Sequence, residues 1–549
     1  MQTRAFNLMK IWCDQLLDYT IKGTGSPYTD GGLICPACHV IHGRIADLVL
    51  PLTVLWDKTG EKNYLDAAVR LVEWSEFNLT FPDGSWRNDA GNQWRGISAF
   101  SAMALGDALL HYEEKLPADI AARWRSIFVR LSDFCLTLTD ICNPVINYYA
   151  GSAAELAMAW KLTGDTRYLD EANRKEAYCR RHFDENGLLC GEGQPHDGLS
   201  GKGCHHIDMG YNTEESLPLL MRHAHLLGDA EKIAFYKARM LDQLEFLLPC
   251  GAIDNSWGTR HNKWTYWGSR TSDGALEGLA LEADDPLFAK AMDAVLGLYE
   301  RCTHDGLLSL PMSAFAGEPT CLHHSFCHAK ALAAVVLENP PAAPAGTLPR
   351  EREYGVKAFQ NGNLLLVSKG GWRATFSSID LANYRGSDNG GGSMNLLWHE
   401  RVGAVCAASM ADYSPSEPLN MQYLRKSAQT PCMTPHIRFA DGRRTVLDKG
   451  ASLTADGDVI RAAGEGWSAS YAFDGDSLTI TAKTDKPAVF SLPIVCPPGV
   501  SLDERMTITA SAPIKADYSR RAFNQVPGFC MIPIELPIDG SVAINIIIR

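Results

Sequence analysis

Groups that can move protons gather in one short segment, residues 205–215, whose sequence is HHIDMGYNTEE. Imidazole, phenol and carboxyl side chains are the usual general acids and bases of enzymes. A binding cleft for a small polar molecule needs a few such groups pointing to one place. The segment therefore supplies the candidate catalytic residues, which are Asp208, Glu214, Glu215, His206 and Tyr211.

Each carboxylate of this segment also has a structural interpretation. A capping box from Asn212 to Glu215 would explain Glu215 without catalysis. Pro218 weakens that interpretation, because proline is disfavoured beyond the first helical turn, and it predicts a helix that begins near Glu214 or later. Capping explains Asp208 less well than it explains the glutamates. Both interpretations stay open at this point.

Other segments of the first half combine tryptophan, arginine and amide side chains. Aromatic rings stack on the apolar faces of sugars, and arginine pairs with a substrate carboxylate, so the mixture is typical of a site for acidic sugars. The candidate substrate-binding residues are His42, Arg44, Trp94, Arg95, Asn147, Tyr148, His205, Trp264, Trp267, Arg270 and Asp273. Asp273 could instead be a helix N-cap, and this alternative remains open.

The segment CPACHVIH at residues 35–42 contains Cys35, Cys38, His39 and His42, which are zinc-ligand types. The sequence has only this one CxxC motif, with no second pair nearby at zinc-finger spacing. We therefore expect no metal site and no other cofactor. The two cysteines are interpreted as packing residues, while His42 faces the substrate.

Repeated helix pairs would position these segments. A helix end, a Gly or Asp turn and a new helix recur at residues 59–61, 163–165, 227–229 and 283–285. Glycine after one helix and Asp or Thr before the next are preferred caps. Helical hairpins repeated along a chain are typical of a helical array or toroid.

The pattern predicts an inner and an outer ring of helices. Apolar helices rich in small residues are predicted near 43–57, 95–110, 146–162, 214–227, 270–283 and 324–337. More amphipathic helices are predicted near 5–20, 61–77, 119–138, 166–182, 229–247 and 286–300. Inner helices are covered on both sides and should be apolar all round. Their N-termini converge on one funnel, where the candidate residues would meet.

After a proline-rich stretch near residue 340 the hydrophobic period changes to two, as in β-strands. The clearest strand patterns lie at 363–368, 372–377, 467–473, 477–482 and 542–548. We therefore predict an α+β multidomain protein. It has an N-terminal (α/α)6 toroid at 1–338, a linker at 339–351 and a C-terminal antiparallel β-sandwich at 352–549.

Composition limits the kinds of partner that the protein can bind and indicates its cellular compartment. The net charge of −13 argues against a nucleic-acid partner, and no uncharged apolar stretch is long enough to span a membrane. The N-terminus reads as an amphipathic helix rather than a signal peptide, so the 16 cysteines are expected to be reduced in a cytoplasmic protein. The expected partner is a uronic-acid-containing oligosaccharide or glycoside, with a possible homodimer.

A toroid followed by an antiparallel sandwich resembles the heparinase II/III-like polysaccharide lyases. Those lyases use a Tyr and a His, with an Asn or Arg that neutralises the uronate. By residue type, the resemblance implies these roles for Tyr211, His206, Asn147 and Arg44. The resemblance implies β-elimination at a uronic acid as the activity.

The same build is similar to glycoside hydrolase family 154, a family of β-glucuronidases. Many heparinase-like lyases have a His-x-His-x-Asp metal segment in the sandwich, whereas residues 390–400 here contain only His399. That difference, the expected cytoplasmic location and the surplus of carboxylates favour the hydrolase. A glycosidase needs two carboxyl groups, one to protonate the leaving oxygen and one to act on water or the anomeric carbon. We therefore expect a glycoside hydrolase that releases a uronic acid, with the lyase as the alternative.

Overall fold

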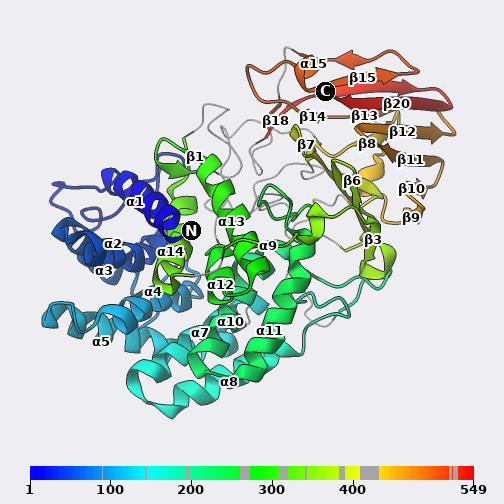
Figure 1. Ribbon diagram of the computed structural model, residues 1–549. Coiled ribbons are helices and arrows are strands. Elements are labelled where there is room, and N and C mark those ends of the chain that lie inside the picture. Colours follow the sequence, from blue (N-terminus) through cyan, green and yellow to red (C-terminus); the bar gives the residue numbers. More distant parts are fainter. Residues whose placement is uncertain are drawn as a thin grey trace.

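The computed structural model describes residues 1–89, 91–142, 145–191, 198–259, 272–309, 319–340, 343–381, 390–407, 432–518, 522–523 and 529–549. Helices fill the N-terminal part and strands fill the C-terminal part, which confirms the predicted fold class. Figure 1 shows the helices at the lower left and the sheets at the upper right, with the chain passing once from one to the other. No helix among the described residues is long and apolar enough to cross a membrane.

Inner helices form a closed ring. Their bounds are Gly43–Leu48 (η1) with Val49–Thr59 (α2), Ile97–Tyr112 (α4), Ile146–Thr163 (α7), Met209–Tyr211 (α9) with Asn212–Ser216 (η2) and Leu217–Leu227 (α10), Leu276–Leu281 (α12) and Leu322–Glu338 (α14). Each contacts the next, and α14 contacts both α12 and α2, so the ring closes. Helices α4, α7 and α14 are buried on nearly all sides, as predicted for an inner ring.

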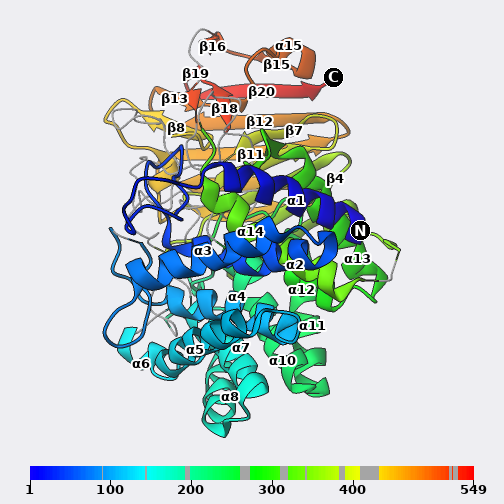
Figure 2. The same cartoon turned by 90° about the vertical axis from the view of Figure 1, so that its left-hand side faces the viewer.

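Outer helices alternate with the inner ones along the chain. They are Gln2–Asp18 (α1), Lys62–Leu79 (α3), Ala118–Cys135 (α5), Thr166–Arg180 (α8), Ala230–Gln243 (α11) and Pro286–Arg301 (α13), with a short α6 at Leu138–Cys142. Each buries only one face, because its other face meets solvent. Figure 2 shows α1, α3 and α5 on the face of the ring turned toward the viewer.

The predicted turn chemistry is present at the hairpins. Gly60, Gly164 and Gly228 end α2, α7 and α10 in the left-handed conformation, with φ values of 75°, 74° and 65°. A residue with a Cβ is strained in this conformation, which explains why glycine occupies these three positions. Asp165 and Asp229 then cap α8 and α11 by accepting a backbone N–H two or three residues ahead.

The fourth inner segment begins earlier than predicted. Asp208 is the N-cap of α9, so the helical path starts at Met209 and not near Glu214. A single wider π turn over Asn212–Ser216 follows before α10. Pro218 lies in the first turn of α10, and the wider turn ahead of it relieves the clash that proline causes in a regular helix.

Antiparallel strands form the C-terminal part. A five-stranded sheet has the order β3 (Gly355–Phe359), β4 (Leu364–Lys369), β5 (Trp372–Ser377), β6 (Ser393–His399), β7 (Gly403–Ala407). A six-stranded sheet has the order β15 (Met506–Ala510), β20 (Ser541–Ile548), β12 (Ser477–Thr484), β11 (Trp467–Asp474), β10 (Val459–Gly464), β9 (Ser452–Asp456). A four-stranded sheet has the order β16 (Lys515–Ala516), β19 (Ile534–Ile538), β13 (Ala488–Ser491), β8 (His436–Phe439). A three-stranded sheet has the order β14 (Ile494–Val495), β18 (Cys530–Ile532), β17 (Ala522–Phe523). A short hairpin, β1 (Thr303–His304) and β2 (Leu307–Leu308), precedes α14.

Strand β4 shows how the two parts are joined. Leu364 and Leu366 belong to the hydrophobic core of the helices, whereas Leu365 and Val367 belong to the core of the sandwich. Side chains alternate between the two faces of a strand, so the five-stranded sheet is covered by helices on one side and by strands on the other. The sandwich therefore packs directly on the helical ring.

Candidate active site

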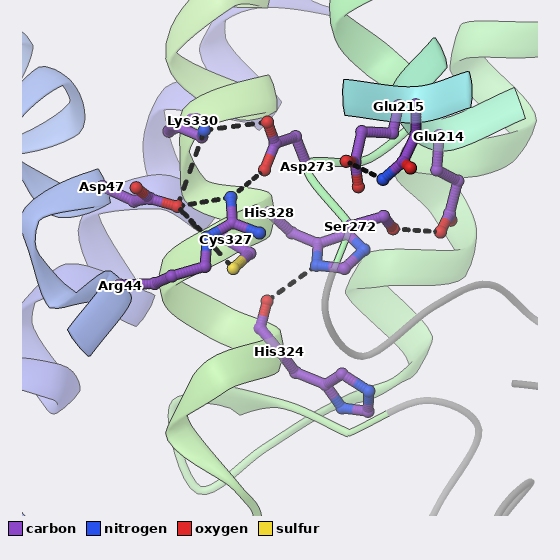
Figure 3. A network of polar contacts seen from close by, with 11 residues as sticks. Arg44, Asp47, Glu214, Glu215, Ser272, Asp273, His324, Cys327, His328 and Lys330 are labelled. Atoms are coloured by element: carbon purple, nitrogen blue, oxygen red, sulfur yellow. Dashed lines mark hydrogen bonds and ion pairs between the residues drawn. The ribbon is translucent and has the colours of Figure 1, made fainter. Parts of the chain in front are cut away.

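The first inner segment places Arg44 in a buried group of charges. Its guanidinium pairs with Asp47 at 2.6 Å and with Asp273, and Lys330 on α14 lies 2.9 Å from Asp273 and 3.6 Å from Asp47. Figure 3 shows these four side chains converging from η1, α14 and the segment before α12. Burial opposes ionisation of Asp273, but Lys330 and Arg44 outweigh it and hold its pKa below the usual value. Two cations and two anions balance each other here.

Asp273 is therefore not the N-cap that the sequence allowed, since the N-cap of α12 is Ala275. The Arg44 side chain is only 6% exposed, and its guanidinium is held by two carboxylates. It also lies 5.0 Å from the ring centre of Phe100. Arg44 is thus a fixed buried cation, and any substrate carboxylate would have to compete with Asp47 and Asp273 for it.

The π turn positions two buried glutamates. Glu214 accepts a hydrogen bond of 2.5 Å from the Ser272 hydroxyl, and Glu215 accepts one of 3.0 Å from the Asn147 amide. Both glutamates are 2% exposed. In Figure 3 they lie side by side, next to Ser272 and Asp273. Single π turns often occur at functional sites, because they turn side chains away from the regular helical positions.

Asn147 brings α7 to the same place. It lies in the first turn of α7 and is 2% exposed. Its amide nitrogen carries two hydrogens, and Glu215 accepts one of them. The second hydrogen can serve a bound ligand. Asn147 is therefore an oriented neutral donor beside the π turn.

His206 and Tyr211 flank the cap of α9. Asp208 is fully buried and accepts the backbone N–H of Tyr211 at 3.1 Å, which fixes Tyr211 at the end of this short helix. His206 precedes the cap, and its carbonyl accepts the N–H of Gly191 at 2.9 Å. Tyr211 is 6% exposed and His206 is 9% exposed. Tyr211 lies four residues and His206 nine residues before Glu215, so the three side chains belong to one continuous segment of the chain.

Trp94 and Tyr148 form a pair at the starts of α4 and α7. The Trp94 indole donates a hydrogen bond of 2.6 Å to the Tyr148 hydroxyl, and their rings meet edge to face at 5.1 Å. Tyr148 also contacts Phe100, the ring under Arg44. Gly96 permits the pair, because a Cβ there would lie 2.2 Å from Tyr148. Phe100 therefore connects the Trp94–Tyr148 pair to Arg44.

Other predicted residues lie elsewhere. Arg95 pairs at 2.5 Å with Asp83, and both side chains are more than a third exposed. The His205 backbone N–H donates to Gln360 of the sandwich at 2.7 Å, which ties this segment to the second domain. His42 joins a cysteine cluster that is described below. Trp264, Trp267 and Arg270 lie outside the described residues.

Sequence analysis missed Lys330 and Ser272. Lys330 lies in the middle of an apolar helix, where a lysine is rarely buried unless it is paired, and that signal could have marked it. Ser272 carried no signal, because serine is common in loops. Its role depends on a contact with Glu214, 58 residues away.

The interior of the ring is filled by a second set of charges. Arg222 on α10 pairs with Asp107 on α4 and, at 2.8 Å, with Glu277 on α12. Burial raises the pKa of Asp107 to about 6 although Arg222 opposes this. A cavity of about 10 Å³ between these groups and Lys330 has room for about one water molecule. The ring is thus packed with ion pairs at this level and is not an open channel.

The ring and the sandwich place the chain in a known structural class. Heparinase III has a TM-score of 0.53 and 9% identity, over 91% of this chain and 76% of that one. A chondroitin AC lyase variant from Streptomyces coelicolor A3 has a TM-score of 0.50 and 12% identity, over 100% of this chain and 79% of that one. At these identities the likeness shows the toroid-plus-sandwich fold alone.

Sequence comparison then identifies the family. Residues 9–351 match the ulvan lyase N-terminal domain, and residues 356–456 match the ulvan lyase C-terminal domain. The broad-specificity ulvan lyase of Formosa agariphila is 33% identical over 580 residues, covering 96% of this chain and 91% of that protein. The chain belongs to the ulvan lyase family, and it is an enzyme.

The prediction of a glycoside hydrolase, and with it the resemblance to family 154, is therefore wrong. That prediction relied in part on the surplus of carboxylates. In the structure each candidate carboxylate has a hydrogen-bond or ion-pair partner. Asp208 caps α9, Asp273 pairs with Arg44 and Lys330, and Glu214 and Glu215 accept hydrogen bonds from Ser272 and Asn147. Their abundance reflects caps and buried pairs, and it does not require a glycosidase pair.

Proposed function

We propose that this protein is a polysaccharide lyase that cleaves a uronic-acid-containing polysaccharide of the ulvan type by β-elimination. Its similarity to the broad-specificity ulvan lyase over 96% of the chain is the observation that supports this function best. A polymer substrate replaces the small glycoside that the sequence suggested. The cleaved bond would be the glycosidic bond at C4 of a uronate.

We assign the chemistry to Asn147, His206 and Tyr211. The Asn147 amide, oriented by Glu215, would donate to the uronate carboxylate and favour removal of the neighbouring C5 proton. His206 and Tyr211 would divide the two proton transfers, since imidazole and phenol can each serve as acid or base. The position of Tyr211, fixed by the Asp208 cap, supports this assignment.

The step balances without any further reactant. A base takes the proton from C5, and that electron pair forms the C4=C5 double bond. The C4–O bond breaks, and the acid gives a proton to the departing oxygen. One product carries an unsaturated uronate at its new end, and the other carries a new hydroxyl group. Water does not enter the products.

A comparison of two products tests this function. Incubation with ulvan should raise ultraviolet absorbance in step with reducing ends, because each elimination creates one conjugated unsaturated uronate. A rise in reducing ends without absorbance would instead indicate hydrolysis and would refute the lyase. A simple β-glucuronide should give no product, since it offers no glycosidic bond at C4 of its uronate.

Variants test the residue assignment. Y211F and N147A should each lower kcat at least about 100-fold, in the range expected for loss of a general acid–base group or an electrostatic donor. Y149F is the matched control, because Tyr149 stacks on Tyr178 at 4.1 Å and has no assigned role. It should keep at least half of the wild-type rate. Full activity in Y211F would remove Tyr211 from the mechanism.

Three further properties remain predictions. The net charge of −13 argues against a nucleic-acid partner, because the phosphate backbone is also negative. Reduced cysteines would fit a cytoplasmic location, which fractionation of the native cells can check. A homodimer is expected, and light scattering of the purified protein would detect it.

A further inference from the structure

Four soft metal-ligating side chains meet between the first and last segments of the inner ring. They are Cys35, Cys38, His42 and Cys321. One ligand atom from each lies within 4.8 Å of all the others. Cys35 and Cys321 are fully buried, and His42 is 2% exposed. This group takes no part in the proposed elimination.

The separations match a tetrahedral zinc site. The Cys321 sulfur lies 3.8 Å from the sulfur of Cys35, 3.6 Å from that of Cys38 and 3.6 Å from Nε2 of His42. Zinc binds sulfur at about 2.3 Å and nitrogen at about 2.0 Å, so a tetrahedron places two sulfurs about 3.8 Å apart and a sulfur and nitrogen about 3.5 Å apart. A disulfide would need about 2.0 Å between sulfurs.

The backbone of the CxxC segment is shaped for thiolates. The Cys38 N–H points at the Cys35 sulfur at 3.4 Å, and the His39 N–H donates to the Cys35 carbonyl at 2.9 Å. His39 takes a left-handed conformation, with φ of 57°, which non-glycine residues seldom adopt. This turn brings Cys35 and Cys38 to one side, and an N–H donor stabilises a sulfur that carries negative charge.

We propose that Cys35, Cys38, His42 and Cys321 bind one Zn²⁺ ion that fastens the segment before η1 to the start of α14. A Cys₃His set is a common structural zinc site, and all four positions are filled by protein, so no open position remains for catalysis. The Cys321 position lies 279 residues from His42 along the chain. Closing so long a loop is what makes a metal cross-link useful in a ring.

Metal content of the purified full-length protein tests the site. Protein expressed with zinc in the medium and purified without chelator should contain about one zinc per chain by plasma mass spectrometry. The double variant C38S/C321S should contain less than a tenth of that amount. C13A/C406A is the matched control, because Cys13 and Cys406 are also buried cysteines but lie outside the cluster, and it should keep the full zinc content.

A conservative variant guards against misfolding. C38H preserves four zinc ligands and should retain at least half of the zinc even if C38S/C321S fails to fold. Cobalt substitution of the wild-type protein gives a second measurement. Co²⁺ in a tetrahedral thiolate site should show strong visible bands and a sulfur-to-metal charge-transfer band in the near ultraviolet.

Several results would overturn the proposal. These are a wild-type protein that neither contains zinc nor takes it up, zinc retained in folded C38S/C321S, iron in place of zinc, or a mass two units lower that reports a disulfide among these cysteines. The test does not depend on the proposed elimination, because metal content is measured without substrate. An inactive protein with one zinc would refute the lyase and keep the site.

Discussion

Two buried clusters connect the segment before α2 to α14. In one, Arg44 and Asp47 meet Lys330 and Asp273, and the protein supplies both signs of charge. In the other, Cys35, Cys38 and His42 meet Cys321, and the protein supplies only sulfur and nitrogen atoms that can bind a metal cation. Both clusters put polar contacts in place of apolar packing between the first inner segment and α14, where the ring closes.

The difference lies in what each cluster needs from outside. The ion cluster is charge-balanced as it stands, since buried charges are tolerated when they are paired. The sulfur cluster gathers groups that bind a metal most strongly once they have lost their protons, so a cation would complete it. The first cluster should therefore respond to mutation and the second to chelation.

Removal of zinc should have the largest effect. Structural zinc contributes on the order of 10 kcal/mol of folding free energy in small domains, which corresponds to a fall in Tm on the order of 10 °C for a helical domain of this size. A strong chelator should lower the Tm of the wild-type protein measured by calorimetry. The Tm of C38S/C321S should not move when chelator is added. An unchanged wild-type Tm, with zinc shown to be removed, would mean that the site does not stabilise the ring.

Breaking the ion cluster should have the next largest effect. D273N leaves two buried cations facing one carboxylate, and removal of one partner from a buried pair costs about 3–5 kcal/mol. Urea unfolding of D273N should show this loss. D284N is the matched control, because Asp284 is exposed, and its effect should stay within about 0.5 kcal/mol. A loss below about 1 kcal/mol in D273N would show that the cluster relaxes around the change.

Glu155 extends this comparison to pH, because it is a buried carboxylate that lies outside the ion cluster. Glu155 on α7 accepts a hydrogen bond from Ser132, and the nearby Lys175, which pairs with Glu171, only partly opposes the effect of burial on the pKa of Glu155. Burial raises its pKa to about 8 from a usual value of 4.5. The native state therefore binds more protons than the unfolded state between these pH values, and the free energy of unfolding should fall as pH rises from about 4.5 to about 8.

The variant E155Q isolates this effect. It should lose the part of the slope that Glu155 contributes, which is at most about 1.4 kcal/mol per pH unit. Urea unfolding of wild-type and variant proteins at several pH values across the window would measure it. Parallel pH profiles for the two proteins would mean that Glu155 is ionised in the folded state.

The exposed pair of Arg95 and Asp83 should matter least. Solvent screens it, and exposed ion pairs contribute less than about 1 kcal/mol, so R95A should change stability by no more than that. Steady-state kinetics on ulvan gives a second readout. An increase in KM with little change in kcat would retain Arg95 as a substrate-binding residue, whereas unchanged kinetics would remove it from the site.

Much of the fold could be predicted from local patterns. Glycines 60, 164 and 228 and the aspartates after two of them marked the hairpins, because cap chemistry is read within a few residues. The alternating strands β4, β5, β11, β12 and β20 followed from side-chain period. The start of the fourth inner segment was missed, because a π turn has no clear sequence signal.

The candidate site was only partly predictable. Sequence patterns were enough to predict the helical ring, the sandwich and the polar character of the segments around Asn147 and residues 205–215. The folded chain was needed to show which carboxylates are held by caps and cations, and that Cys321 joins Cys35, Cys38 and His42. These residues are far apart along the chain, which explains why local patterns did not reveal them. Helix caps and hydrophobic periodicity involve residues that are close in sequence, whereas these contacts join residues that meet only when the ring closes.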